Sequence, residues 1–282
     1  MTAPPTEWLA LFQAAMAPAM LVLLVYNADK LLSTQASKDL AAQITNTAAE
    51  PALSKGTLAL EEFLREKFPS GKDRKKFWLN VLALTAISLT VLLAVYTSRT
   101  SGLLQQLFTK GFILQFLGVG VVTTLLVNAF AFSQYPNLLA SFASQSVARN
   151  VLWLLADLAA KAILFLALTA IMYMVFAKTR GAFGGDLASA LQAVPRTVHL
   201  AIRFENLTAV YVYSLVLSSF PLQLAILVKL MIVHPRLAVA AQKLLYFLPL
   251  AEKPFRGAAV VLALFASLFC LILALLIGPF AS

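Results

Sequence analysis

Long apolar runs separated by short basic connections dominate the pattern along this chain. A helix of roughly 20 apolar residues crosses the hydrocarbon layer of a bilayer. Six runs approach or exceed that length: residues 8–26, 77–96, 112–132, 151–176, 207–233 and 258–280. Soluble proteins do not carry several such runs. We therefore predict an all-α, polytopic membrane protein with about six transmembrane helices plus amphipathic interfacial helices.

The pattern divides the chain into three parts. Residues 1–26 form a first transmembrane helix, 27–76 form a cytoplasmic amphipathic helical segment, and 77–282 form a helical membrane domain with about five spans. The second part ends with apolar residues at the i, i+3, i+4 and i+8 spacing of an amphipathic helix: Leu60, Phe63, Leu64 and Phe68. Its mixed charge suits a protein contact better than a lipid surface.

The stretch 111–148 allows a second interpretation, because it carries no charge and contains Pro136. It holds either one span or a hairpin of two. A hairpin would move the C-terminus to the opposite side of the membrane. The single span gives the larger difference in Lys and Arg between the two sides, which favours it.

Two later segments are amphipathic. Residues 184–204 keep apolar side chains on one face at helical spacing: Leu187, Leu191, Val194, Val198 and Ile202. Arg196, His199 and Arg203 share another face, and residues 236–248 have a similar pattern. A helix with an apolar stripe beside a basic stripe lies in the plane of a membrane. We therefore expect Arg196, His199 and Arg203 to contact lipid headgroups or a partner.

Composition agrees with this architecture. Hydrophobic residues make up 61% of the chain and charged residues 12%, against about 45–50% and 25% in a typical soluble domain. The formal net charge is +10. Basic residues collect on the cytoplasmic side of membrane proteins and attract anionic lipid, which accounts for this charge without nucleic acid. We expect anionic headgroups as a partner and no nucleic acid.

The loops predict an orientation. Most Lys and Arg residues fall on the side of residues 27–76, which the positive-inside rule places in the cytoplasm with both termini outside. Residues 1–25 contain no Lys or Arg, so we expect the first run to remain as a span and not to be a cleaved signal. The bacterial inner membrane is the expected location, with the endoplasmic reticulum as the alternative.

The most expensive polar groups in these runs are Asp157 and Lys161. They are four residues apart, so they share a helix face and can pair. A lone charge at the centre of a span costs at least about 2.5–3.5 kcal/mol, and pairing lowers that cost. The pair either belongs to an ion or proton pathway or neutralises itself while packing this helix onto its neighbours. A third interpretation starts the span later, with Asp157 at the interface.

Neutral polar side chains cluster in two other runs. Asn128 lies late in the third run, and the fifth carries Ser214, Ser218 and Gln223 around Pro221. Such groups hydrogen-bond helices to one another. They also line polar passages, where a proline opens the backbone. The sequence favours the packing interpretation and leaves the passage open.

Motifs for catalysis and for metal or cofactor binding are not apparent. His199 and His234 are the only histidines, Cys270 is the only cysteine, and neither GxSxG nor HExxH occurs. We expect no catalytic residues, no metal and no cofactor.

Three classes of function follow. The first is a non-catalytic integral subunit that acts as a scaffold or assembly component of a larger membrane complex, with membrane protein partners or as a homo-oligomer. The second is an ion or small-solute channel or transporter that uses Asp157, Lys161 and the polar face of the fifth run. The third is a lipid-handling protein, in which Arg196, His199 and Arg203 meet headgroups.

Overall fold

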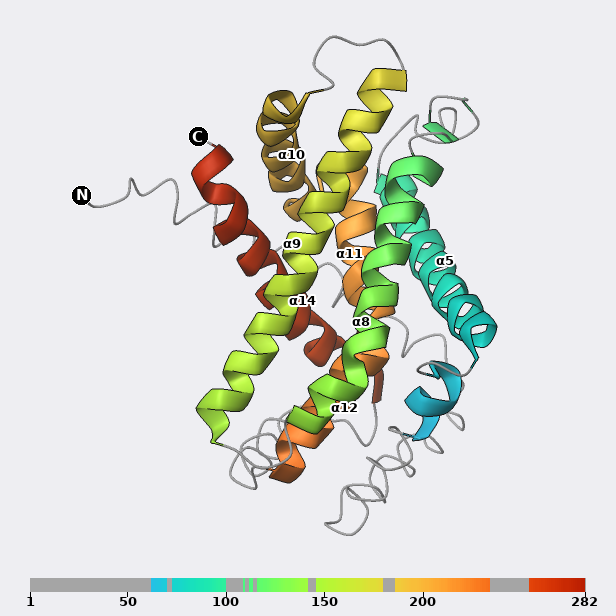
Figure 1. Cartoon of the computed structure of the whole chain (residues 1–282), viewed down its shortest axis with the longest axis vertical. Coiled ribbons are helices and arrows are strands. Elements are labelled where there is room, and N and C mark those ends of the chain that lie inside the picture. The colour runs from blue at the N-terminus through green and yellow to red at the C-terminus, as the bar shows by residue number, and fades with distance from the viewer. Residues whose placement is uncertain are drawn as a thin grey trace, which may run out of the picture.

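The computed structural model describes residues 62–69, 73–99, 109, 112–113, 116–141, 146–179, 186–233 and 254–281, and this part of the chain is helical with no strand. A short helical stretch at 62–67 comes first. The elements that follow are α5 (Arg74–Arg99), η1 (Phe116–Val121), α8 (Val122–Ser141), α9 (Val147–Thr179), α10 (Leu187–Ile202), α11 (Thr208–Ser218), α12 (Phe220–Val233) and α14 (Pro254–Ala281) (Figure 1). The predicted all-α class is confirmed.

Three helical segments are long and apolar enough to cross a membrane: Arg74–Ser98, Phe116–Leu138 and Val147–Val175. They correspond to the second, third and fourth predicted runs. The last predicted run lies within α14, in which Leu262–Gly278 is a shorter apolar helix. The first predicted run, residues 27–61 of the predicted cytoplasmic segment and the segment at 236–248 lie outside the described residues.

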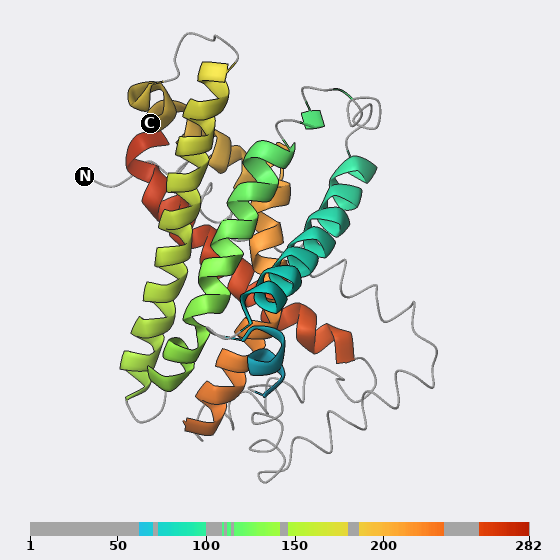
Figure 2. The ribbon, with the colours of Figure 1, turned by 45° about the vertical axis from the view of Figure 1, so that its right-hand side comes forward.

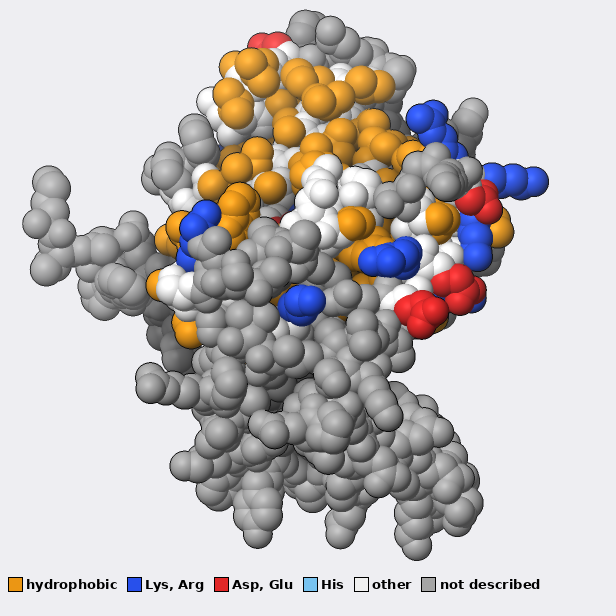
Figure 3. Space-filling view, turned by 60° about the horizontal axis from the view of Figure 1, so that its bottom comes forward, with side chains coloured by type: hydrophobic (Ala, Val, Ile, Leu, Met, Phe, Trp, Pro, Cys, Tyr) orange, Lys and Arg blue, Asp and Glu red, His pale blue; other side chains and the backbone are white. Residues whose placement is uncertain are grey.

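Large apolar side chains cover much of the outer surface of the described helices. Leu79 on α5 and Leu152 on α9 are 63% and 66% exposed, and α14 exposes Leu264 and Leu275 in the same way. Hydrophobic side chains gather over a broad area of the surface seen in Figure 3. Extended apolar surface of this kind marks contact with lipid or with another protein.

Helix α11 forms the centre of the bundle. It packs against α5, α8, α10 and α14, and it lies behind α8 in both ribbon views (Figures 1 and 2). Nearly all of its side chains are buried, including the large rings of Tyr211 and Tyr213. Burial therefore favours a hydrogen-bond partner inside the protein for each polar side chain of this helix.

The fifth predicted run, 207–233, does not form one helix. It is divided into α11 and α12, with Ser219 between them at φ −83° and ψ 2°. Pro221 lies in the first turn of α12, where its missing N–H removes no helical hydrogen bond within α12. The prediction of a single continuous span is wrong here because the proline begins a new helix.

The stretch 111–148 contains a single long helical segment in its described part. Residues of η1 and α8 continue without interruption, and Pro136 lies inside α8. The hairpin alternative is wrong, because the proline that would have formed its turn is helical. A proline within a helix leaves one carbonyl without its usual donor, which a membrane helix tolerates when neighbours compensate.

The described end of the 27–76 segment packs against α8. Leu64 and Phe68 are buried, and the Phe68 ring stacks on Phe132 with a centroid distance of 4.0 Å. The side-chain amide of Asn80 donates to the carbonyl of Lys67, at 2.5 Å. These contacts fix the start of α5 beside α8.

A tight turn joins α10 to α11. Phe204 adopts φ 61°, and the N–H of Glu205 bonds to the carbonyl of Leu200, as at a helix end closed by a left-handed residue. That position favours glycine, and a side chain there costs roughly 1–2 kcal/mol. The Phe204 ring packs edge-on against Tyr96 and Tyr213, which compensates for that cost.

The amphipathic segment 184–204 contains α10, in which Val194, Val198 and Ile202 of the predicted apolar face are buried. The buried residues are Ala190, Val194, Pro195, Val198, Ala201 and Ile202. Leu187 and Leu191, predicted on the apolar face, are 59% and 47% exposed. The buried stripe is therefore displaced from the predicted one and includes two small residues, Ala190 and Ala201.

Candidate functional site

Asp157 and Lys161 form an ion pair on one face of α9. The ammonium of Lys161 donates to Asp157 Oδ2, and both side chains are less than 10% exposed. This contact matches the pairing expected from their i, i+4 spacing. A buried charge persists when it has a partner of opposite sign and hydrogen bonds to it. The pair is therefore neutral as a unit, and its ammonium extends into the bundle.

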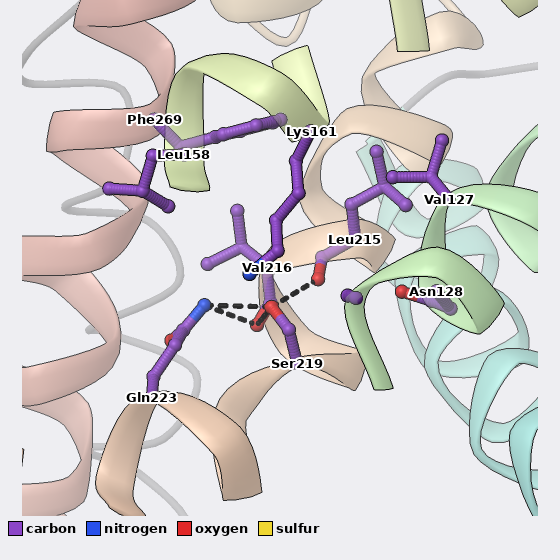
Figure 4. Close-up of a pocket in the computed structure, with 10 residues that line it drawn as sticks. Val127, Asn128, Leu158, Lys161, Leu215, Val216, Ser219, Gln223 and Phe269 are labelled. Carbon is purple, nitrogen blue, oxygen red and sulfur yellow. Dashed lines mark hydrogen bonds between the residues drawn. The ribbon is translucent and has the colours of Figure 1, made fainter. Parts of the chain in front are cut away.

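The Lys161 side chain lines a cavity of about 20 Å³ where α8, α9, α11, α12 and α14 meet. Figure 4 shows the Lys161 side chain running from α9 toward Val216, Ser219 and Gln223. The lining consists of Val127, Asn128, Ala131, Leu158, Lys161, Leu215, Val216, Ser219, Gln223 and Phe269. Polar atoms from three different elements thus face a small space with apolar walls.

The break between α11 and α12 supplies the oxygen atoms of this cavity. Ser219 donates its hydroxyl to the carbonyl of Leu215 at 2.6 Å, and Gln223 Nε2 donates to Ser219 Oγ at 2.8 Å and to the carbonyl of Val216 at 3.2 Å (Figure 4). The Leu215 carbonyl also accepts the backbone N–H of Ser219, so these side chains add hydrogen bonds to carbonyls in the last turn of α11. Gln223 Oε1 is buried and has no hydrogen-bond partner.

A second polar cluster lies beside the cavity. Asn128 Nδ2 donates to Thr85 Oγ1 at 2.9 Å, Ser218 donates to Asn128 Oδ1 at 2.8 Å, and the hydroxyls of Ser88 and Ser214 are 2.7 Å apart. All five residues are buried. We call these five residues the closed network. Asn128 also lines the cavity, so the two clusters share one residue.

The structure therefore brings together the predicted residues Asp157, Lys161, Asn128, Ser218 and Gln223. Thr85 and Ser88 on α5 were not predicted as site residues. They form a pair of hydroxyls three apart within an apolar run, which is a signal that could have been recognised. Each hydroxyl is close to residues on other helices, and only tertiary packing determines which residues these are.

The predicted basic face of α10 is separate from the cavity. Arg196 is exposed, His199 is half-buried, and Arg203 forms a partly exposed ion pair with Glu205, at 3.8 Å. None of the three lines the cavity. At the other end of α10, hydrogen bonds from Ser189 lower the pKa of Asp186, whose side chain accepts from the Ser189 N–H at 2.9 Å. This contact caps the helix.

The backbone of the π-helical segment η1 lies close to a side chain of α11. A Cβ on Gly120 would lie 2.0 Å from Cε1 of Tyr211, so only glycine fits at this position. The hydroxyl of Tyr211 is buried with no hydrogen-bond partner. Single π-helical turns often occur near functional sites. The absence of a side chain at Gly120 allows η1 to lie against the Tyr211 ring of α11.

Groups of three or more His, Cys, Asp or Glu that could hold a metal do not occur among the described residues. Comparison of the whole chain with protein-family models, curated proteins and solved structures finds no match. The chemistry of the site therefore has to be judged from its own geometry.

Proposed function

We propose that this protein is a polytopic membrane protein of about six spans that moves a small ion or solute across the membrane. The observation that carries the proposal is the cavity at the α11–α12 break, which combines the paired ammonium of Lys161 with the unpartnered Gln223 Oε1. An ionisable side chain inside a membrane protein is expensive, and such residues mark ion and substrate pathways.

A broken helix at the centre of the bundle supports this proposal. In many transporters, discontinuous helices form the binding site, because the freed carbonyls and helix ends coordinate ions. Irregular backbone at membrane depth occurs only where protein or a water-filled cavity surrounds it. Here the break lies in the most buried part of the fold and borders the cavity.

The orientation and location belong to the same proposal. The excess of Lys and Arg on one side places 27–76 in the cytoplasm, with the bacterial inner membrane as the location and the endoplasmic reticulum as the alternative. The basic face of α10, with Arg196, His199 and Arg203, then meets anionic headgroups. Binding to anionic vesicles should fall when Arg196 and Arg203 are changed to Gln.

Flux in reconstituted liposomes tests the proposal. Lys161→Met should remove most of the flux of small ions, measured with ion-sensitive dyes, while Lys67→Ala should leave it unchanged because Lys67 pairs with Glu66 at the surface. The double change Asp157→Asn with Lys161→Met keeps the site neutral and serves as the control for folding. Undiminished flux in folded Lys161→Met would contradict the proposal.

A second candidate is a scaffold or assembly subunit of a larger membrane complex. The closed network favours it, because its mutually satisfied hydroxyls and amides join α5, α8 and α11 into a rigid unit. Native mass spectrometry after gentle extraction from the source membrane distinguishes the two candidates. Stoichiometric foreign subunits would favour the scaffold, whereas a monomer or homo-oligomer with flux would favour transport.

A further inference from the structure

The Gln223 side chain leaves a hydrogen-bond acceptor unused at the cavity. Its Nε2 donates to Ser219 Oγ at 2.8 Å and to the carbonyl of Val216 at 3.2 Å. Because a carbonyl accepts and cannot donate, the second bond determines which end of the amide is the nitrogen. The acceptor without a partner is therefore Oε1, in a residue that is only 4% exposed.

The Lys161 side chain offers the complementary donor. An ammonium carries three N–H donors, and among the residues that the structure describes it donates to Asp157 Oδ2 alone. Lys161 is buried, so bulk solvent does not supply acceptors for the other two. Lys161 and Gln223 both line the cavity, and Figure 4 shows the Lys161 side chain reaching toward Gln223 from α9. A spare donor and a spare acceptor thus border one space without bonding to each other.

The size of the cavity limits what can join them. Its volume of about 20 Å³ exceeds the roughly 10–15 Å³ that one water needs and leaves no room for an organic molecule. Purely apolar walls would leave such a space dry, whereas a buried water is held by two to four polar partners. The polar atoms of the lining therefore decide whether the cavity is hydrated.

Ser219 supplies a third polar atom. Its hydroxyl donates to the carbonyl of Leu215 and accepts from Gln223 Nε2, so one lone pair of Oγ remains. The cavity thus presents one donor, the Lys161 ammonium, and two acceptors, Gln223 Oε1 and Ser219 Oγ. A water accepts one hydrogen bond and donates two, which matches this set.

The same set of atoms argues against an ion. The ammonium of Lys161 repels a cation, and the lone pairs of Gln223 Oε1 and Ser219 Oγ repel an anion. Lys161 and Asp157 already neutralise each other, so any ion would add a buried charge without a counter-charge, which is strongly unfavourable. A neutral molecule that both donates and accepts fits the lining.

We propose that this cavity binds one ordered water molecule, which joins α9 to the break between α11 and α12. The water accepts from the Lys161 ammonium and donates to Gln223 Oε1 and Ser219 Oγ. Lys161 then contacts Asp157 on its own helix and, through the water, α11 and α12. This bridge goes beyond the transport function proposed above, because it holds the broken helix against α9 whether the protein moves an ion or assembles a complex.

Filling the cavity tests the proposal, because a hydrated cavity and a dry one respond with opposite sign. Val127→Ile and Val216→Ile each add one methylene from a different wall of the cavity, in the full-length protein purified in detergent. If a water is displaced, Gln223 Oε1 and the ammonium lose a partner, and Tm should fall by about 2–6 °C. Filling a dry cavity raises Tm instead.

A second background separates water displacement from overpacking. Gln223→Met removes the acceptor and keeps an unbranched side chain. Overpacking alone lowers Tm equally in both backgrounds, whereas a displaced water predicts a fall that is greater by at least about 2 °C in the native background. Val91→Ile, on the exposed face of α5, is the matched control and should leave Tm unchanged in both.

A density map of the native protein, at a resolution that shows ordered water, gives the direct readout. We expect a solvent peak about 2.7–3.2 Å from Lys161 Nζ, Gln223 Oε1 and Ser219 Oγ. A rise in Tm on filling, equal shifts in both backgrounds, or a map without this peak would each overturn the proposal. If Gln223→Met does not fold, the sign of the Tm shift in the native background and the map decide. Flux enters none of these readouts, so the transport proposal can fail while the water site stands, and the reverse.

Discussion

Two clusters of buried polar side chains lie next to each other in this bundle, and they differ in how completely they satisfy one another. In the closed network, Thr85, Asn128 and Ser218 form a chain of hydrogen bonds, and Ser88 and Ser214 pair directly. At the cavity, the acceptor Gln223 Oε1 has no partner. Asn128 belongs to both clusters.

The difference indicates different roles for similar chemistry. A buried polar group with all its partners stabilises packing, whereas one without a partner costs free energy and persists only for another reason. Helix α11 contributes to both clusters along its length. Its Ser214 faces α5, and its C-terminal end opens onto the cavity. The comparison therefore predicts that changes in the closed network mainly affect stability, whereas a change at Gln223 mainly affects function at the cavity.

The largest expected effect is at the ion pair. Asp157→Ala leaves the Lys161 ammonium buried without its partner, which should lower the free energy of unfolding by about 3–5 kcal/mol. Thermal unfolding in detergent measures this. Changing both residues, Asp157→Asn with Lys161→Met, should recover most of the loss. A single change that leaves stability intact would mean that the ammonium reaches water, and the cavity would then not be shielded.

The next largest effect on stability is expected at Asn128, the residue that both clusters share. Asn128→Leu removes the donor to Thr85 and the acceptor of Ser218, so it leaves buried hydroxyls without partners. We expect a loss of about 1–3 kcal/mol, measured by thermal unfolding beside Ser133→Ala as the exposed control. If the loss is absent while flux changes, the hydrogen bonds of Asn128 contribute little to stability and its main role is at the cavity.

The Gly120–Tyr211 contact tests whether α11 can shift. A Cβ at Gly120 would lie 2.0 Å from the Tyr211 ring, which is buried. Gly120→Ala should therefore cost about 1–3 kcal/mol, as overpacking does. Adding Tyr211→Leu should relieve part of the clash. If Gly120→Ala is neutral, this end of the bundle adapts easily and is not held as closely as the contact indicates.

A smaller effect on stability is expected from the hydrogen bond between Ser88 and Ser214. Their hydroxyls are 2.7 Å apart, and hydrogen bonds between membrane helices average about 0.6 kcal/mol in double-mutant cycles. The cycle of Ser88→Ala, Ser214→Ala and the double variant should give a coupling of that size. A coupling near zero would show that the pair is fortuitous and that Asn128 alone joins the two helices.

The smallest effect comes from a polar contact outside both clusters, which serves as a reference. The pKa of Asp186 is lowered by Ser189, so the cap stabilises α10 above the ordinary carboxyl pKa and is lost as the pH falls through the lowered value. Asp186→Asn keeps a capping side chain and should remove this acid-dependent part of the stability. Thermal unfolding from neutral to acid pH should show the difference only at the acid end.

The sequence predicted the parts of this fold that depend on local pattern. Length and hydropathy locate α5, α8, α9 and α14, and the spacing of Asp157 and Lys161 predicts their contact. Hydropathy does not detect the division of 207–233, because the residues on both sides of the break are apolar. Pro221 was the signal, but a proline inside an apolar run also occurs within a continuous helix, as Pro136 does in α8.

The site was predictable only in part for a related reason. Ser214, Ser218 and Gln223 stand out as polar residues within an apolar run, and so does Asn128. Which of them are satisfied depends on the rotation and depth of other helices, which no local pattern specifies. Ser88 meets Ser214 across 126 positions of sequence. The role of each residue at the cavity remains a prediction for the experiments above.

In the proposed membrane placement, the length of α9 has a consequence for the surrounding lipid. The helix has 33 residues, so at 1.5 Å per residue it is about 50 Å long, while the hydrocarbon layer is about 30 Å thick. Tilting within the usual range of about 0–40° does not absorb the difference, so one or both ends extend beyond the hydrocarbon. Bilayer thickness then sets the depth of Asp157 and Lys161. Thin and thick membranes should expose this pair to water to different extents.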